Sequence, residues 1–142
     1  MDADEVVRLR RAIGRLARQF NTSATDGGLT PTQASVLGLV AVHGPLSLAE
    51  LVRLEHINPT MLSRVVGKLD EAGLITRTPD PDDLRSAALS ATRRGKQLHQ
   101  RIRDQRAAAV SRAADRLPLK DQAALVRALR ALEQLAEQLQ TE

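Results

Sequence analysis

Two helix-start signals that follow one another closely constrain the fold of this chain more than any other feature. Ser47 and Glu50 form the S-x-x-E pattern of a capping box, in which the two side chains satisfy backbone N–H groups at the start of a helix. Asn58 followed by Pro59 is a second start, with asparagine as the cap and proline in the first turn. Residues 55–57 are a tight link between them. Two short capped helices joined in this way predict a helix-turn-helix, with helices to about residue 54 and about residue 72.

The helix is predicted to end at Gly73, because glycine commonly ends a helix, and the residues after it predict strands. Residues 74–78 are β-prone, residues 79–83 combine proline with aspartate as turns do, and residues 86–90 are a weaker second strand. We therefore expect a β-hairpin with a long tip. Apolar residues at helical spacing predict four further helices. These are expected over 5–20, over 31–43 with Thr30 as the cap, over 93–116 with Thr92 as the cap, and over 119–140.

Composition narrows the classes of function. The chain has one Phe and no Tyr or Trp, so its core must consist of Leu, Val, Ile and Ala. It also has almost no aromatic faces on which to stack single-stranded nucleic acid. The absence of cysteine excludes disulfides, thiolate metal sites, cysteine nucleophiles and thiol redox switches. A net charge of +4 favours polyanionic partners weakly, so a nucleic-acid surface requires a fold that gathers scattered arginines on one face.

The second helix of the motif has an apolar stripe on one side and polar residues on the other. The polar residues can donate hydrogen bonds to base edges and phosphates in a major groove, and an arginine can bind guanine bidentately. Gly67 on the same side permits close approach of the backbone. A solvated helix face is the alternative, and the helix-turn-helix followed by a hairpin favours DNA over it. The stripe consists of Leu62, Val65, Val66 and Leu69, and the polar side carries Thr60, Ser63, Arg64 and Lys68.

The hairpin is the second element that can reach DNA. Arg77 lies on its first strand, and Asp83 and Arg85 lie at its tip or on its return. An arginine projected beside a recognition helix can enter the adjacent minor groove, where negative potential is concentrated. Asp83 can hold the Arg85 guanidinium in one orientation. The alternative is a surface ion pair of little energetic weight.

Taken in order, these motifs resemble those of the MarR family of winged helix-turn-helix regulators. The resemblance covers nearly the whole chain and is most specific over residues 47–95. Leu84 stands where the family often has a second wing arginine. The motifs that carry the resemblance are Ser47-Leu-Ala-Glu-Leu51, Asn58-Pro-Thr-Met-Leu-Ser-Arg64, Leu69-Asp-Glu-Ala-Gly-Leu-Ile75, Arg77, Asp80-Pro-Asp-Asp-Leu-Arg-Ser86 and Thr92-Arg-Arg-Gly95.

The resemblance implies a mainly α fold with a small β-wing, in which one domain spans residues 1–142. Residues 30–91 would form the winged helix-turn-helix, and residues 1–25 and 92–142 would form dimerisation helices. It further implies a homodimer that binds a palindromic double-stranded operator, represses transcription and is released by a small-molecule ligand. The expected DNA contacts are Ser47, Asn58, Pro59, Thr60, Ser63, Arg64, Lys68, Arg77, Asp83, Arg85 and Ser86.

The terminal helices support dimerisation independently of the resemblance. Both are amphipathic, and a single chain of this size offers limited core to cover them. The expected dimer contacts are Leu9, Ile13 and Leu16 near one end of the chain and Leu125, Leu129, Leu132 and Leu139 near the other.

Alternative functions have less support in the residues. A metal-responsive regulator would need clustered ligands, and His43, His56 and His99 form no i, i+4 pair. A winged-helix dimer that binds proteins instead of DNA would be expected to lack the arginines at 64, 77 and 85, which are present. No catalytic motif is found, so we expect neither an enzyme nor a cofactor. With no apolar run of about 20 residues and no signal peptide, we expect a cytoplasmic protein that does not enter a membrane. Its effector, of which the sequence gives no site, is expected to be small and anionic or aromatic.

Overall fold

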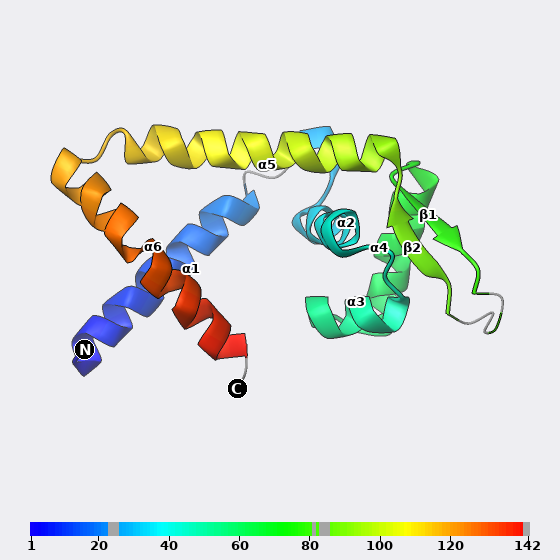
Figure 1. The fold of residues 1–142 in the computed structure, drawn as a ribbon, viewed down its shortest axis with the longest axis horizontal. Helices are drawn as coiled ribbons and strands as arrows, with labels where there is room; N and C mark the ends of the chain where they lie inside the picture. The colour runs from blue at the N-terminus through cyan, green and yellow to red at the C-terminus, as the bar shows by residue number, and fades with distance from the viewer. Residues whose placement is uncertain (23–25, 81, 83–85, 141–142) are drawn as a thin grey trace. The chain divides into compact units, whose positions relative to one another are not determined.

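The computed structural model describes residues 1–22, 26–80, 82 and 86–140, and consists of helices with one small sheet (Figure 1). The chain divides into two compact units, Met1–Arg106 and Ala107–Glu142. The predicted mainly α fold with a β-wing is confirmed. In chain order the elements are α1 (Ala3–Thr22), the short 3₁₀ helix η1 (Asp26–Gly28), α2 (Pro31–His43), α3 (Leu48–Glu55), α4 (Pro59–Glu71), β1 (Ile75–Thr78), β2 (Ala88–Ala91), α5 (Arg93–Ala114) and α6 (Leu119–Gln140).

The first unit has a core built from α2, α3, α4, the sheet and the first half of α5. Helix α4 packs against α2 and α3, and α2 also contacts β2. The core is aliphatic, as the composition predicts. Its fully buried members are Val36, Leu37, Val40, Leu51, Leu62, Val66, Leu69, Ile75 and Leu89.

Side-chain caps begin the helices α2, α3 and α4 of this core. Asn58 Oδ1 accepts a hydrogen bond from Met61 N at 2.7 Å, as predicted. The capping box expected at Ser47 forms only in part: Ser47 Oγ accepts from Glu50 N, but the Glu50 carboxylate accepts from the Ser47 hydroxyl and not from a backbone N–H. A complete box occurs instead at Thr30, whose N–H donates to the Gln33 side chain while its hydroxyl accepts from Gln33 N.

The two strands pair antiparallel, with Ile75 opposite Ala91 and Thr78 opposite Ala88. The sequence predicted a second strand from Ser86, but the strand begins at Ala88. On the opposite strand Pro79 follows Thr78, and because proline has no N–H to donate, the ladder of hydrogen bonds cannot continue past this pair. Leu46, between α2 and α3, adds an isolated bridge to Leu89, which ties the sheet to the helix-turn-helix.

A dense set of contacts joins the end of α4 to the start of α5. Gly73 has a φ of 72°, which glycine adopts without strain. The Thr92 hydroxyl donates to Gly73 O at 2.7 Å and accepts from Gly95 N at 3.0 Å. Gly95 packs so closely on the Leu74 carbonyl that a Cβ at this position would overlap its oxygen. The T-x-x-G motif thus holds the beginning of α5 against the base of the wing.

The terminal helices bury little in the structure. Over residues 3–20 of α1 the side chains are exposed except for a half-buried Leu9. Helix α5 ends at Ala114, slightly before the predicted residue 116, and Pro118 disfavours helical backbone at Leu117 beyond it. Helix α6, in the second unit, has no buried residue. No helix in the part of the chain that the structure describes is long and apolar enough to cross a membrane.

Candidate nucleic-acid interface

The polar side of α4 faces outward. Its buried residues are the four predicted from helical spacing, of which Leu62 and Val66 are fully inaccessible. The predicted polar residues Thr60, Ser63, Arg64 and Lys68 are all exposed, and so are Asn58 and Pro59 at the helix start. Ser47, at the start of α3, is half-buried. The hydrophobic core therefore fixes which face of α4 is available to a partner.

The turn between α3 and α4 depends on His56. This residue ends α3 in the left-handed conformation, with φ of 55° and ψ of 35°. Its N–H donates to Val52 O, which closes the last turn of the helix. Histidine enters this conformation more readily than most residues, so the turn forms without glycine. Two residues later Asn58 caps α4, and the tight link is complete.

A hollow of about 520 Å³ lies beside the outward face of α4. We call it the α2–α4 hollow, because residues from the start of α2 and from α4 line it together. None of these residues is acidic, and Arg64 and Lys68 contribute two positive charges. The lining consists of Thr30, Thr32, Gln33, Asn58, Thr60, Met61, Arg64, Val65 and Lys68. Sequence alone does not associate Thr32 or Gln33 with this surface, because the two segments meet only in the folded chain.

In the wing, Arg77 has a partner that the sequence did not indicate. Its Nε lies 3.6 Å from Asp70 Oδ2, and both side chains are about half exposed. The ion pair connects β1 to the last turn of α4 across the Gly73 turn. Asp83 and Arg85, which were predicted to pair and to reach the minor groove, lie outside the described residues. Ser86 is described and exposed.

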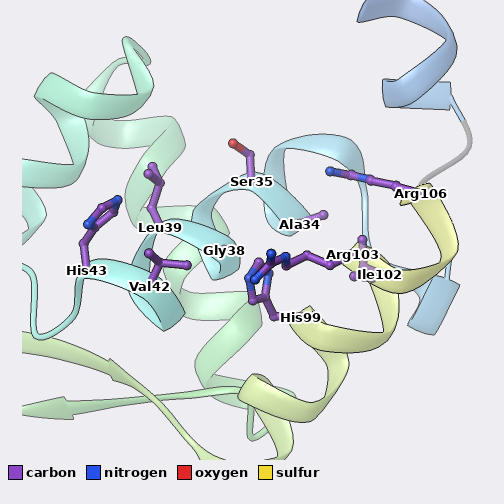
Figure 2. Close-up of a pocket in the computed structure, with 10 residues that line it drawn as sticks. All are labelled: Ala34, Ser35, Gly38, Leu39, Val42, His43, His99, Ile102, Arg103 and Arg106. Carbon is purple, nitrogen blue, oxygen red and sulfur yellow. The ribbon is translucent and has the colours of Figure 1, made fainter. Parts of the chain in front are cut away.

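A second cavity, of about 350 Å³, lies between α2 and α5 (Figure 2). We call it the α2–α5 cavity. His99, Arg103 and Arg106 enter it from α5, and His43 lies on α2. None of the residues that line it is acidic. The remaining lining residues are Ala34, Ser35, Gly38, Leu39, Val42 and Ile102.

His99 is the most perturbed group in this cavity. Its imidazole packs on Gly38, where a Cβ would approach His99 Cε1 to 3.2 Å. Burial, and then the positive charges of Arg103 and Arg106, lower the pKa of His99 below the usual histidine value. Within the described chain, His99 Nε2 and Arg106 Nε are buried without a hydrogen-bond partner. Two unsatisfied nitrogens in a cationic cavity favour an anionic guest.

Histidine spacing did not reveal this cavity. His43 and His99 are far apart in the sequence, and packing of α5 on α2 brings both to one site. No group of three metal-ligating side chains occurs among the described residues, so metal sensing gains no support. At the cavity edge, the Ser35 hydroxyl donates to Glu55 Oε2 at 2.9 Å, which links α2 to the last residue of α3.

Comparison with known proteins places this geometry in a family. The model of the MarR family matches residues 29–87, which include α2, α3, α4 and β1. The HTH-type transcriptional repressor Mb2911 of Mycobacterium bovis is 32% identical over 104 residues, covering 72% of this chain and 71% of that protein. This chain belongs to the MarR family.

Further relatives and solved structures show how far the likeness extends. The HTH-type transcriptional repressor NicR of Pseudomonas putida is 32% identical over 90 residues, and the match spans 57% of its length, less than two thirds. The crystal structure of Rv1404 from Mycobacterium tuberculosis has a TM-score of 0.80 at 27% identity, with 96% of each chain covered. The MarR family protein Rv2887 of the same organism, solved in complex with p-aminosalicylic acid, has a TM-score of 0.68 at 27% identity and covers 94% of this chain and 99% of that one.

Proposed function

We propose that this MarR-family chain is a sequence-specific double-stranded DNA-binding repressor of transcription. It acts in the cytoplasm as a homodimer on a palindromic operator, by binding and not by catalysis. The observation that carries the proposal is the outward polar face of α4, which carries Arg64 and Lys68 opposite a buried apolar stripe. A helix of this kind, in a helix-turn-helix with a wing, suits the major groove. The relatives named as repressors support the same function.

Arg64 is the residue proposed to read sequence. It is exposed near the start of α4, where side chains of a recognition helix reach base edges. Arg85, at the wing, is proposed to contact the minor groove and the backbone. The two arginines therefore have different expected effects on specificity, and this difference is the basis of the test.

The operator is first obtained by selecting bound fragments from a pool of duplex DNA. Arg64→Ala and Arg85→Ala are then titrated on this operator and on a scrambled duplex at several salt concentrations. Arg64→Ala is expected to lose about 1–3 kcal/mol more on the operator than on the scrambled duplex. Arg85→Ala is expected to weaken both more evenly and to flatten the salt dependence by about one charge.

Two outcomes would contradict this assignment. Equal losses on both duplexes for Arg64→Ala would mean that Arg64 binds only phosphate. No loss for either variant, or no selected fragment at all, would remove the DNA-binding function and leave a winged-helix dimer that binds proteins as the better explanation.

The α2–α5 cavity is the proposed effector site. Its cationic lining and the two unsatisfied nitrogens suit a small anion, and p-aminosalicylic acid, found bound to Rv2887, belongs to that class. The Ser35–Glu55 hydrogen bond gives this cavity a direct connection to the end of α3. An anion that draws the Ser35 hydroxyl into the cavity would release Glu55 beside the His56 turn. Release of the operator would then follow from a change in that turn.

A further inference from the structure

We propose that the α2–α4 hollow receives a phosphate of the DNA backbone, held by Lys68 and Thr32. The start of α2 would then be part of the DNA-binding surface, together with α4 and the wing. The inference rests on the proposed function, since it assigns a further contact to the same partner.

The hollow lies on one side of α4 only. At about 100° per residue, Met61, Val65 and Lys68 fall on the side that faces α2, Thr60 lies at the rim of the hollow, and Gly67 falls on the side away from it. Arg64 lies between the two groups. A duplex that presents its base edges to Arg64 and Thr60 would therefore bring one of its strands over the hollow.

Charge and hydrogen-bonding capacity favour a phosphate there. Lys68 is exposed and has no ion-pair partner in the described part of the chain. Thr32 is half-buried in the first turn of α2, which contains no acidic residue. In the capping box the Thr30 hydroxyl and the Gln33 side-chain oxygen act as acceptors, and the Thr32 hydroxyl is a further side-chain donor that this turn can offer. The N–H groups at the starts of α2 and α4 add positive potential near the hollow.

The surroundings of the hollow indicate duplex DNA and not a free phosphate ion as the occupant. Lys68 and Thr32 are accessible from outside and lie next to Asn58 and Thr60, which the duplex is expected to cover. Among the described residues, the hollow is open on that side. Phosphate contacts position a protein on a duplex without reading its sequence. This contact should therefore fix the register of the protein on the DNA and raise its affinity for DNA, without discriminating between sequences.

The test introduces a negative charge at Thr32 and compares it with the same charge elsewhere. In Thr32→Glu the carboxylate lies in the first turn of α2, where it favours the helix, so the variant should fold at least as well as the parent. We expect about a tenfold or greater loss of affinity for both the operator and the scrambled duplex, because the carboxylate repels the phosphate. Gln97→Glu, on an exposed position of α5 outside the hollow, is the matched control and should change affinity by less than about twofold.

A second variant tests the cation. Lys68→Ala should weaken both duplexes by a similar factor and flatten the salt dependence by about one charge, whereas Arg64→Ala should act mainly on the operator. Inorganic phosphate at constant ionic strength should not compete with DNA at the hollow, and competition that Lys68→Ala abolishes would make a free ion the occupant. The inference is overturned if Thr32→Glu binds both duplexes as well as Gln97→Glu does, or if its loss is confined to the operator. Failure of the unmodified protein to bind any duplex would instead overturn the proposed function.

Discussion

At the scale of single residues, His99 is the titratable group, among those in the described part of the chain, whose pKa the fold shifts. It lies between α2 and α5 with Arg103 and Arg106 beside it, and the cavity has no carboxylate to stabilise a second proton. In the unfolded chain the same histidine would titrate near 6.5. Just below pH 6.5, therefore, His99 is mostly protonated in the unfolded chain but mostly neutral in the folded chain.

The sign of the resulting pH dependence follows from linkage. Because the pKa is lower in the folded state, the unfolded state binds more protons, and the free energy of unfolding falls as the pH drops below about 6.5. We expect a smaller fall between pH 7 and pH 5 in His99→Gln than in the parent, measured by urea unfolding. An NMR titration should place the His99 pKa below that of an ordinary histidine, and p-aminosalicylate in the cavity should raise it. An unchanged pH dependence in the variant would show that His99 is not the responsible group.

At the scale of elements, α4 combines a firm buried side with a Gly in the middle of its outward side. A Cβ added at Gly67 would have no heavy atom within 4 Å, so the structure itself has room for alanine there. Gly in a helix interior costs about 0.5–1 kcal/mol relative to Ala. We expect Gly67→Ala to raise the free energy of unfolding by about this amount and to lower operator affinity, because the added methyl group separates the helix backbone from DNA. Urea unfolding and operator titration measure the two effects, and a variant that gains stability without losing affinity would show that DNA does not approach Gly67 closely.

The same elements show what sequence can predict and what it cannot. Helix starts at residues 31, 59 and 93 follow from Thr30, Asn58 and Thr92, because a cap acts within one turn of its own helix. The buried stripe of α4 follows from spacing for the same local reason. The α2–α4 hollow and the α2–α5 cavity depend on how helices pack, and no local pattern connects Thr32 with Lys68 or His43 with His99. The Asp70–Arg77 pair likewise requires the Gly73 turn to fold the strand back beside α4.

At the scale of the whole molecule, α6 has an apolar face without cover in the single chain. Leu125 and Leu129 are about half exposed, and Leu139 is 63% exposed. Exposed apolar surface of this extent marks an interface, and the homodimer proposed above would bury it. The contributions of Leu9, Ile13 and Leu16 to that dimer, and the assignment of residues 1–142 to one domain, remain predictions.

Leu129→Glu tests the interface directly. A carboxylate in the centre of the apolar face should shift the protein toward monomer and lower operator affinity, since each subunit would then bind its half-site alone. Gln134→Glu, on the opposite side of α6, adds the same charge and should leave the dimer intact. Light scattering at micromolar concentration distinguishes the two, and a monomeric parent protein would remove the dimer model.

The contacts that tie the start of α5 to the end of α4 also determine where this chain can recombine with a relative. Thr92 bonds to the Gly73 carbonyl, and Gly95 packs on the Leu74 carbonyl. In a chimaera of this chain and a relative, a junction inside the wing would separate these partners. A relative with a side chain at the position of Gly95 would then place its Cβ against the Leu74 oxygen. A crossover beyond Ile102, the last buried residue of α5, leaves every one of these contacts within one parent. The wing and the first three turns of α5 are therefore expected to be inherited as one block, and a chimaera should take its DNA-reading part from one parent through this point.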